Sequence, residues 1–160
     1  MPTQVAGLSG VRAIAAGDYH SLAVKDDGTV WQWGFWQIPL RWGDSVYWLN
    51  CYVGDAEAVG LAGVMSISAR SEHGMALGND GTVWAWGANV GNYLGTGTYS
   101  ALVPPTMVLG IAGVAGVAAG EQVIAAVDCL GDLWHWGMSY PGSSPAILYP
   151  IGEPRRVTVF

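Results

Sequence analysis

Short apolar segments alternate with glycine-containing turns along the whole chain. Residues 21–24, 74–77 and 124–127 are short runs of apolar and small residues. The first two are followed by Asp27-Gly28 and Asp80-Gly81, and the third by Leu130-Gly131. Asp-Gly between two apolar segments predicts a β-hairpin, because glycine adopts the positive φ of the turn without steric cost. The pattern therefore predicts short antiparallel strands, with a less well specified turn at Leu130-Gly131.

The strands recur as a repeat. A Trp-x-Trp-Gly motif begins at Trp31, Trp84 and Trp134, so successive copies lie 53 and 50 residues apart. A Gly-Val pair precedes each copy, at residues 10–11, 63–64 and 113–114. Landmarks that move together at a constant period are typical of a repeat architecture. The chain is therefore expected to contain three consecutive units.

Both faces of the strands are apolar, which indicates how the units pack. Trp31 and Trp33 lie on one side of their strand and Val30 on the other. A sheet with one solvent-exposed face would carry polar residues on that face. Each sheet is therefore expected to pack between two neighbouring sheets, as propeller blades do. The expected fold is all-β: three four-stranded antiparallel blades and a strand of a fourth, forming an open arc unless other copies complete it.

A Pro-x-x-Val segment recurs at residues 2–5, 105–108 and 154–157 and is expected to begin a unit. A single domain of residues 1–160 is therefore divided into repeats at 2–55, 56–104 and 105–153, with residues 154–160 starting a further repeat.

Residues 11–34 resemble the repeat of the regulator of chromosome condensation family, and Trp84-Ala-Trp-Gly followed by Tyr93-Leu94-Gly95 resembles its continuation. Two positions depart from the pattern: Arg70 replaces the glycine seen at Gly17, and Val123 replaces the histidine seen at His20. The resemblance implies a propeller, usually of seven blades. It also implies partner binding, since some members act as exchange factors on small GTPases or inhibit enzymes.

Composition indicates contact with other protein surfaces. Only 11% of the residues are charged, against about 25% in an ordinary soluble domain, so apolar surface is expected to meet a partner. The net charge of −6, with six Lys and Arg residues, argues against nucleic-acid binding. No apolar run is long enough for a membrane-spanning helix. A signal peptide is not visible, which predicts a cytoplasmic chain by default and an extracellular one if the chain is a mature form or an excerpt.

Candidate chemistry is sparse. His20 and His73 recur at matching positions, but Val123 takes the third, so the histidines are interpreted as structural and no metal site is expected. Cys51 and Cys129 have no C-x-x-C spacing and are interpreted as free thiols, although the sequence leaves their disulfide state open. The carboxylates lie mostly in turns, which explains them without an acid/base pair. We therefore expect a non-enzymatic protein with no catalytic residue and no cofactor.

Residues 35–53 carry six aromatic side chains beyond the repeat core. Aromatic residues dominate interface hot spots. Three interpretations remain open: a lid folded over its own blade, a surface for a partner or another copy, or a platform that stacks carbohydrate. The candidate interaction residues here are Phe35, Trp36, Trp42, Tyr47 and Trp48.

The two ends of the arc are the other candidate interaction surfaces. If each end blade exposes about 400 Å² of apolar surface, leaving it wet forgoes on the order of 10 kcal/mol. Copies are therefore expected to self-assemble, as a six-bladed ring of two chains or as a head-to-tail filament. The C-terminal segment is expected to add to the next chain's sheet through Arg155, Val157, Val159 and Phe160. The alternatives are an excerpt of a larger regulatory propeller that binds a partner protein, or a Trp-rich carbohydrate binder.

Overall fold

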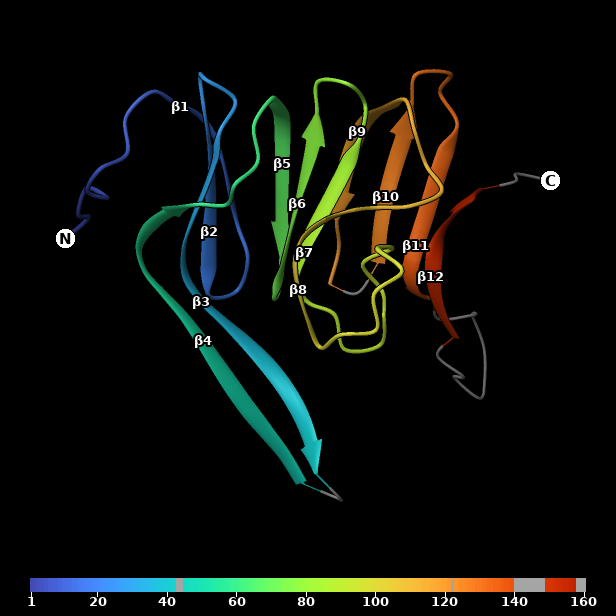
Figure 1. Ribbon diagram of the computed structural model, residues 1–160, viewed down its shortest axis with the longest axis horizontal. Helices are drawn as coiled ribbons and strands as arrows, with labels where there is room; N and C mark the ends of the chain where they lie inside the picture. Colours follow the sequence, from blue (N-terminus) through green and yellow to red (C-terminus); the bar gives the residue numbers. More distant parts are fainter. Residues whose placement is uncertain (43–44, 122, 140–148, 158–160) are drawn as a thin grey trace.

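Three four-stranded antiparallel sheets make up the chain (Figure 1). The computed structural model describes residues 1–42, 45–121, 123–139 and 149–157. The first sheet contains β1 (Val11–Ala16), β2 (His20–Lys25), β3 (Val30–Trp42) and β4 (Ser45–Ala58). The second contains β5 (Val64–Arg70), β6 (His73–Gly78), β7 (Val83–Ala88) and β8 (Leu102–Met107). The third contains β9 (Val114–Ala119), β10 (Val123–Asp128), β11 (Leu133–Ser139) and β12 (Tyr149–Arg156).

The sheets stand side by side in chain order, each a simple up-and-down meander (Figure 1). The first strands of neighbouring sheets meet, β1 with β5 and β5 with β9. These strands therefore form the inner edge of an open arc, which confirms the expected propeller blades. The described residues contain no helix, and thus none long and apolar enough to cross a membrane.

Two apolar cores lie between successive sheets. Between the first two sheets, Leu22, Val24 and Val30 pack against Val64, Ala76 and Trp86. Between the second and third, Met75, Leu77 and Val83 pack against Val114, Ala126 and Trp136. The same three positions of one blade thus cover the same three positions of the next. This is the physical reason that both faces of each strand are apolar in the sequence.

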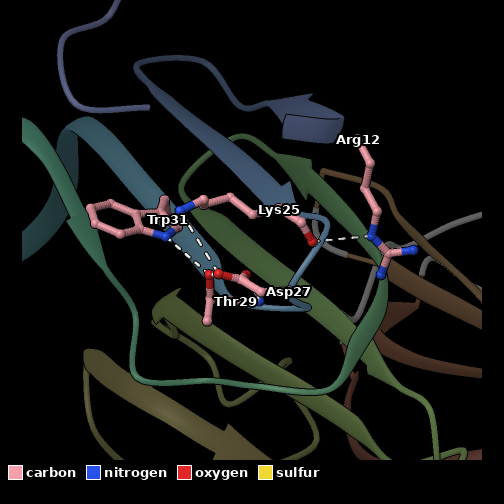
Figure 2. Close-up of polar contacts among 5 residues, drawn as sticks. All are labelled: Arg12, Lys25, Asp27, Thr29 and Trp31. Atoms are coloured by element: carbon pink, nitrogen blue, oxygen red, sulfur yellow. Dashed lines mark hydrogen bonds and ion pairs between the residues drawn. The ribbon is translucent and has the colours of Figure 1, made fainter. Parts of the chain in front are cut away.

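Side-chain hydrogen bonds hold the turn before each Trp-x-Trp strand, and Figure 2 shows those of the first blade. The Thr29 hydroxyl donates to Asp27 Oδ1 at 2.6 Å and accepts from Trp31 Nε1 at 3.2 Å. Asp80, Thr82 and Trp84 repeat this arrangement in the second blade. These bonds tie the tryptophan ring to the turn that precedes its strand.

The third blade specifies its turn by a different residue. Asp128 Oδ1 accepts from the backbone amides of Leu130 and Asp132, both at 2.9 Å. The second oxygen of Asp128 accepts from Trp134 Nε1 at 2.9 Å. The turn at Leu130-Gly131, expected to be weakly specified, is therefore as well anchored as the other two.

We expect Thr29→Val to lower the free energy of unfolding by about 1 kcal/mol, because it removes the hydroxyl that joins Asp27 to Trp31. Urea denaturation followed by tryptophan fluorescence measures the change. Thr3→Val is the matched control: its hydroxyl makes only an exposed 3.5 Å contact outside the sheets. An equal effect of the two substitutions would contradict the role of the turn.

Two of the three Pro-x-x-Val segments end blades, although all three are expected from the sequence to begin units. Residues 105–107 close β8, and the Val108 amide donates to the Val83 carbonyl at 2.8 Å. Residues 154–156 close β12, and the Val157 amide donates to the Leu133 carbonyl at 2.7 Å. The structure thus places residues 154–156 in the third sheet and not in a fourth, because their backbone groups pair with β11. The sheets accordingly run 11–58, 64–107 and 114–156.

Candidate functional site

Each junction between blades uses the same backbone hydrogen bond. The Val64 amide donates to the Gly28 carbonyl at 3.1 Å, and the Val114 amide donates to the Gly81 carbonyl at 3.0 Å. In the repeat, the equivalent donor of the first blade is Val11, and the equivalent acceptor of the third blade is Gly131. The chain therefore carries the donor half of this junction on its first sheet and the acceptor half on its third.

The open face of the third sheet, formed by Gly116, Ala118, Ala125, Val127 and Leu133, is called here the third-sheet face. It borders a shallow hollow of about 310 Å³ that no charged residue lines in the described part of the chain. Val127 and Leu133 are 38% and 49% exposed. Their equivalents in the second blade, Leu77 and Val83, are fully buried against the third sheet. The third-sheet face thus matches one half of a blade junction.

The open face of the first sheet, formed by Val11, Ile14 and Trp33, is called here the first-sheet face. Val11 is 40% exposed, whereas its equivalents Val64 and Val114 are 1% and 5% exposed. Ile14 is 76% exposed, and Trp33 is only half-buried. The tryptophan equivalents in the other two blades, by contrast, are buried in the cores between sheets. This face is the matching second half of the same junction.

The aromatic segment 35–53 is neither a loop nor a closed lid. β3 and β4 extend into a long hairpin, paired as far as Trp42 and Ser45, that projects from the first sheet (Figure 1). At its base, Trp36 is 5% exposed and stacks on His20 at 3.9 Å. Phe35 stacks on Tyr19 at 4.7 Å. Trp36 therefore belongs to the core rather than to an interaction surface.

Farther out, the hairpin presents exposed aromatic side chains. Tyr47 and Trp48 are 59% and 58% exposed, and Leu49 is 48% exposed. Trp42 is the last residue of β3, near the tip of the hairpin. Of the residues singled out in this segment, Tyr47 and Trp48 thus remain available to a partner in this structure.

The C-terminal candidates are spread differently from expectation. Arg155 is exposed and lies opposite His135 in the pairing of β12 with β11. Val157 is half-buried at the end of the same strand. Val159 and Phe160 lie outside the described residues. Because this sheet already uses the backbone of residues 154–156, those residues are not a spare strand for another chain.

A polar hollow of about 390 Å³, called here the acidic hollow, opens on the rim of the arc where the turns between the first and second strands of the three blades converge. Three carboxylates line it: Asp18, Glu72 and Glu121, one from each blade. Three aromatic side chains also line it: Tyr19, Trp48 and Tyr93. In the described part of the chain, no lysine or arginine lines it.

The environment of the acidic hollow shifts two titratable groups. Burial raises the pKa of Glu72, and the negative charge of Asp18 raises it further. The backbone amide of Gln37 donates to Glu72 Oε2 at 2.7 Å and opposes this shift. Burial, with a smaller effect of Glu72, raises the pKa of Tyr93, whose hydroxyl donates to the Ala88 carbonyl at 2.6 Å.

Two buried imidazoles lie beside the acidic hollow, in neighbouring blades. His20 is 3% exposed and His73 is fully buried, and among the described residues none makes a hydrogen bond of normal geometry to their ring nitrogens. Burial lowers the pKa of each to about 4. Asp18 opposes the shift of His20, whereas His20 itself adds to the shift of His73. The pair therefore acts as neutral core packing.

Within the residues that the structure describes, no three His, Cys, Asp or Glu side chains gather closely enough to hold a metal ion. Cys51 and Cys129 are free thiols, half-buried and exposed respectively.

The acidic hollow was not predicted from the sequence, because its carboxylates are explained there as turn residues. One signal was present: Asp18, Glu72 and Glu121 all fall within three residues before the start of a blade's second strand. That these turns meet depends on the curvature of the arc, which a repeat period does not specify.

Comparison with known proteins agrees with this architecture. The model of the regulator of chromosome condensation (RCC1) repeat matches residues 11–35. The mitochondrial RCC1 domain-containing protein RUG3 of Arabidopsis thaliana is 28% identical over 142 residues, which cover 86% of this chain and 31% of RUG3. Protein RCC1 of Candida albicans is 32% identical over 98 residues, which cover 54% of this chain and 21% of that protein.

Among solved structures, yeast RCC1 (Prp20) bound to Kap60 superposes with a TM-score of 0.75 at 25% identity. The match covers 96% of this chain and 38% of the yeast chain. This chain thus spans about a third or less of the length of the curated relatives described above.

Proposed function

Because this chain belongs to the RCC1-like repeat family, we propose that it is a non-enzymatic protein-interaction module whose first-sheet and third-sheet faces join copies of it head to tail. The observation that carries this proposal is the blade junction, which forms twice within the chain and whose two halves recur on the first-sheet face and the third-sheet face. A copy that continues the arc places its Val11 amide where Val64 and Val114 stand in the internal junctions, opposite the Gly131 carbonyl. Such copies close into a ring or extend as a filament.

Packing supports the same arrangement. The third-sheet face offers Val127 and Leu133, and the first-sheet face offers Val11, Ile14 and Trp33. The internal junctions bury the equivalents of Val11, Trp33, Val127 and Leu133 almost completely, and they partly bury those of Ile14. Fully burying one such side chain contributes about 1.5–3 kcal/mol. Several of them together are enough to offset part of the entropy lost on association.

We expect Leu133→Asp to weaken self-association at least 100-fold, or about 3 kcal/mol, because it buries an unpaired carboxylate in the junction. Sedimentation equilibrium over a range of concentrations measures the change against the chain mass of 16.8 kDa. Leu130→Asp is the matched control: Leu130 is 83% exposed but lies in the turn, off the third-sheet face. A monomeric wild-type chain, or equal effects of the two substitutions, would overturn the proposal.

A mixing experiment tests the head-to-tail direction. Leu133→Asp disables one face, and Ile14→Asp disables the other, so we expect each variant alone to be monomeric. Mixed together, they retain one intact junction between them and are expected to form 1:1 dimers that grow no further. Dimers formed by either variant alone would contradict a head-to-tail contact.

A further inference from the structure

We infer that the acidic hollow binds the side chain of an arginine presented by a partner protein. This inference is independent of the head-to-tail contact. The hollow lies on the rim of the arc, among the strand turns and the hairpin, and not on either open sheet face. Its lining comes from all three blades and from the β3–β4 hairpin. Its volume of about 390 Å³ falls within the range of about 300–1,000 Å³ typical of ligand sites.

The charge of the hollow selects a cation. Asp18, Glu72 and Glu121 converge on it without a lysine or arginine among its described lining residues. Asp18 acts electrostatically on Glu72, so two of these carboxylates lie close enough to repel each other. A bound cation relieves this repulsion. The attraction of the cation is strongest at a partly buried carboxylate such as Glu72, where water screens the charges less.

The aromatic walls select the kind of cation. Trp48 and Tyr19 line the hollow and are 58% and 48% exposed, so their ring surfaces are accessible. Tyr19 is held in place by stacking on Phe35, and Tyr93 by its hydroxyl bond to the Ala88 carbonyl. A planar guanidinium stacks on aromatic rings and pairs with carboxylates through two parallel hydrogen bonds, which a lysine ammonium does not do. The combination therefore favours arginine.

The surroundings of the hollow favour a protein as the source of that arginine. Val90 also lines the hollow and is 42% exposed. Together with Trp48 and Tyr19, it provides an aromatic and apolar border for the peptide that carries the side chain. Arginine and aromatic residues are the side chains that dominate protein interfaces.

Binding can be measured with the tripeptide acetyl-Gly-Arg-Gly-amide as the probe. The indole N–H signal of Trp48, assigned through Trp48→Phe, is followed by NMR as the peptide is added. We expect a saturable shift. The same peptide with citrulline, a neutral isostere of arginine, is expected to bind at least tenfold more weakly. Equal binding of the two peptides would overturn the inference.

Two carboxylate variants locate the site. Glu72→Gln preserves an acceptor for the Gln37 amide and is expected to weaken arginine binding at least fivefold. Glu153→Gln removes an exposed carboxylate outside the hollow and is expected to leave the affinity unchanged. Asp18→Asn provides a second test if Glu72→Gln fails to fold. Unchanged affinity in the folded hollow variants contradicts the inference, as does binding of guanidinium ion alone that is as tight as that of the peptide.

Discussion

Acidification from pH 7 to pH 5 is expected to destabilise this protein by several kcal/mol, through the buried pair His20 and His73. Both imidazoles are almost wholly inaccessible, and in the described part of the chain no hydrogen bond of normal geometry reaches their ring nitrogens. A protonated imidazole at either position would be a buried charge without a counter-ion in contact. The folded state therefore resists protonation, and the pKa of each histidine falls from 6.5 to about 4.

The sign of the effect follows from where the protons bind. Above pH 6.5 both states are neutral at these positions, so the histidines contribute nothing to the pH dependence. Between pH 6.5 and pH 4 the unfolded chain takes up protons that the folded chain does not, so stability falls as the pH falls. The loss at pH 5 is on the order of 2 kcal/mol for each imidazole.

Urea denaturation at a series of pH values measures this loss. His73→Gln removes one titrating group, and we expect it to reduce the slope of stability against pH between 6.5 and 4 by about half. Tyr93→Phe is the control: it removes the hydroxyl bond beside His73 and should lower stability equally at every pH in this window. Stability that is constant from pH 7 to pH 5 would contradict the expected burial of the pair.

A substitution of Gly87 by alanine is expected to cost roughly 4 kcal/mol of folding free energy. Gly87 ends the Trp-x-Trp-Gly motif of the second blade at a φ of +107°, which residues with a side chain rarely adopt. A Cβ atom there would meet the Glu72 carbonyl oxygen and lie 2.9 Å from the His73 Cα. The tight approach is needed because the next residue, Ala88, donates its amide to that same carbonyl at 2.8 Å.

Gly60→Ala separates backbone strain from steric clash. Gly60 also has a positive φ, +84°, but nothing lies within 4 Å of the position that a Cβ would occupy. We expect this control to cost about 1 kcal/mol, from the unfavourable φ alone. Chemical denaturation of both variants compares them, and equal costs would show that the close approach at Gly87 contributes nothing.

Much of the blade could be predicted from local sequence because its signals are local. The Trp-x-Trp-Gly strand and the Asp-Gly turns involve residues close in the chain, and the structure pairs them as expected. The third turn shows the limit: Asp128 replaces the missing aspartate from two residues upstream of Leu130. An anchor from another position satisfies the same geometry, and the simple motif does not reveal it.

The expectations that failed all concerned which segments meet. Residues 154–156 read as the start of a new unit, but their backbone pairs with β11 and closes the third sheet. For the aromatic segment 35–53 the sequence left a lid, a partner surface and a carbohydrate platform open, and it did not predict that the segment continues β3 and β4 as a paired hairpin. The pairing partner of a strand depends on the chain path around it, and a local pattern carries no information about that path.

By itself, the sequence determined the repeat, the strands, the turns and the apolar character of both sheet faces, because period and side-chain alternation are properties of neighbouring residues. Only the tertiary structure decided which apolar faces remain open and where charges gather. Val127 and Leu77 occupy equivalent positions of the repeat. Val127 is 38% exposed and Leu77 is fully buried, because only Leu77 packs against a following blade in this structure. Asp18, Glu72 and Glu121 lie far apart in the chain. They share one hollow because the stacked blades bring their turns to the same rim of the arc.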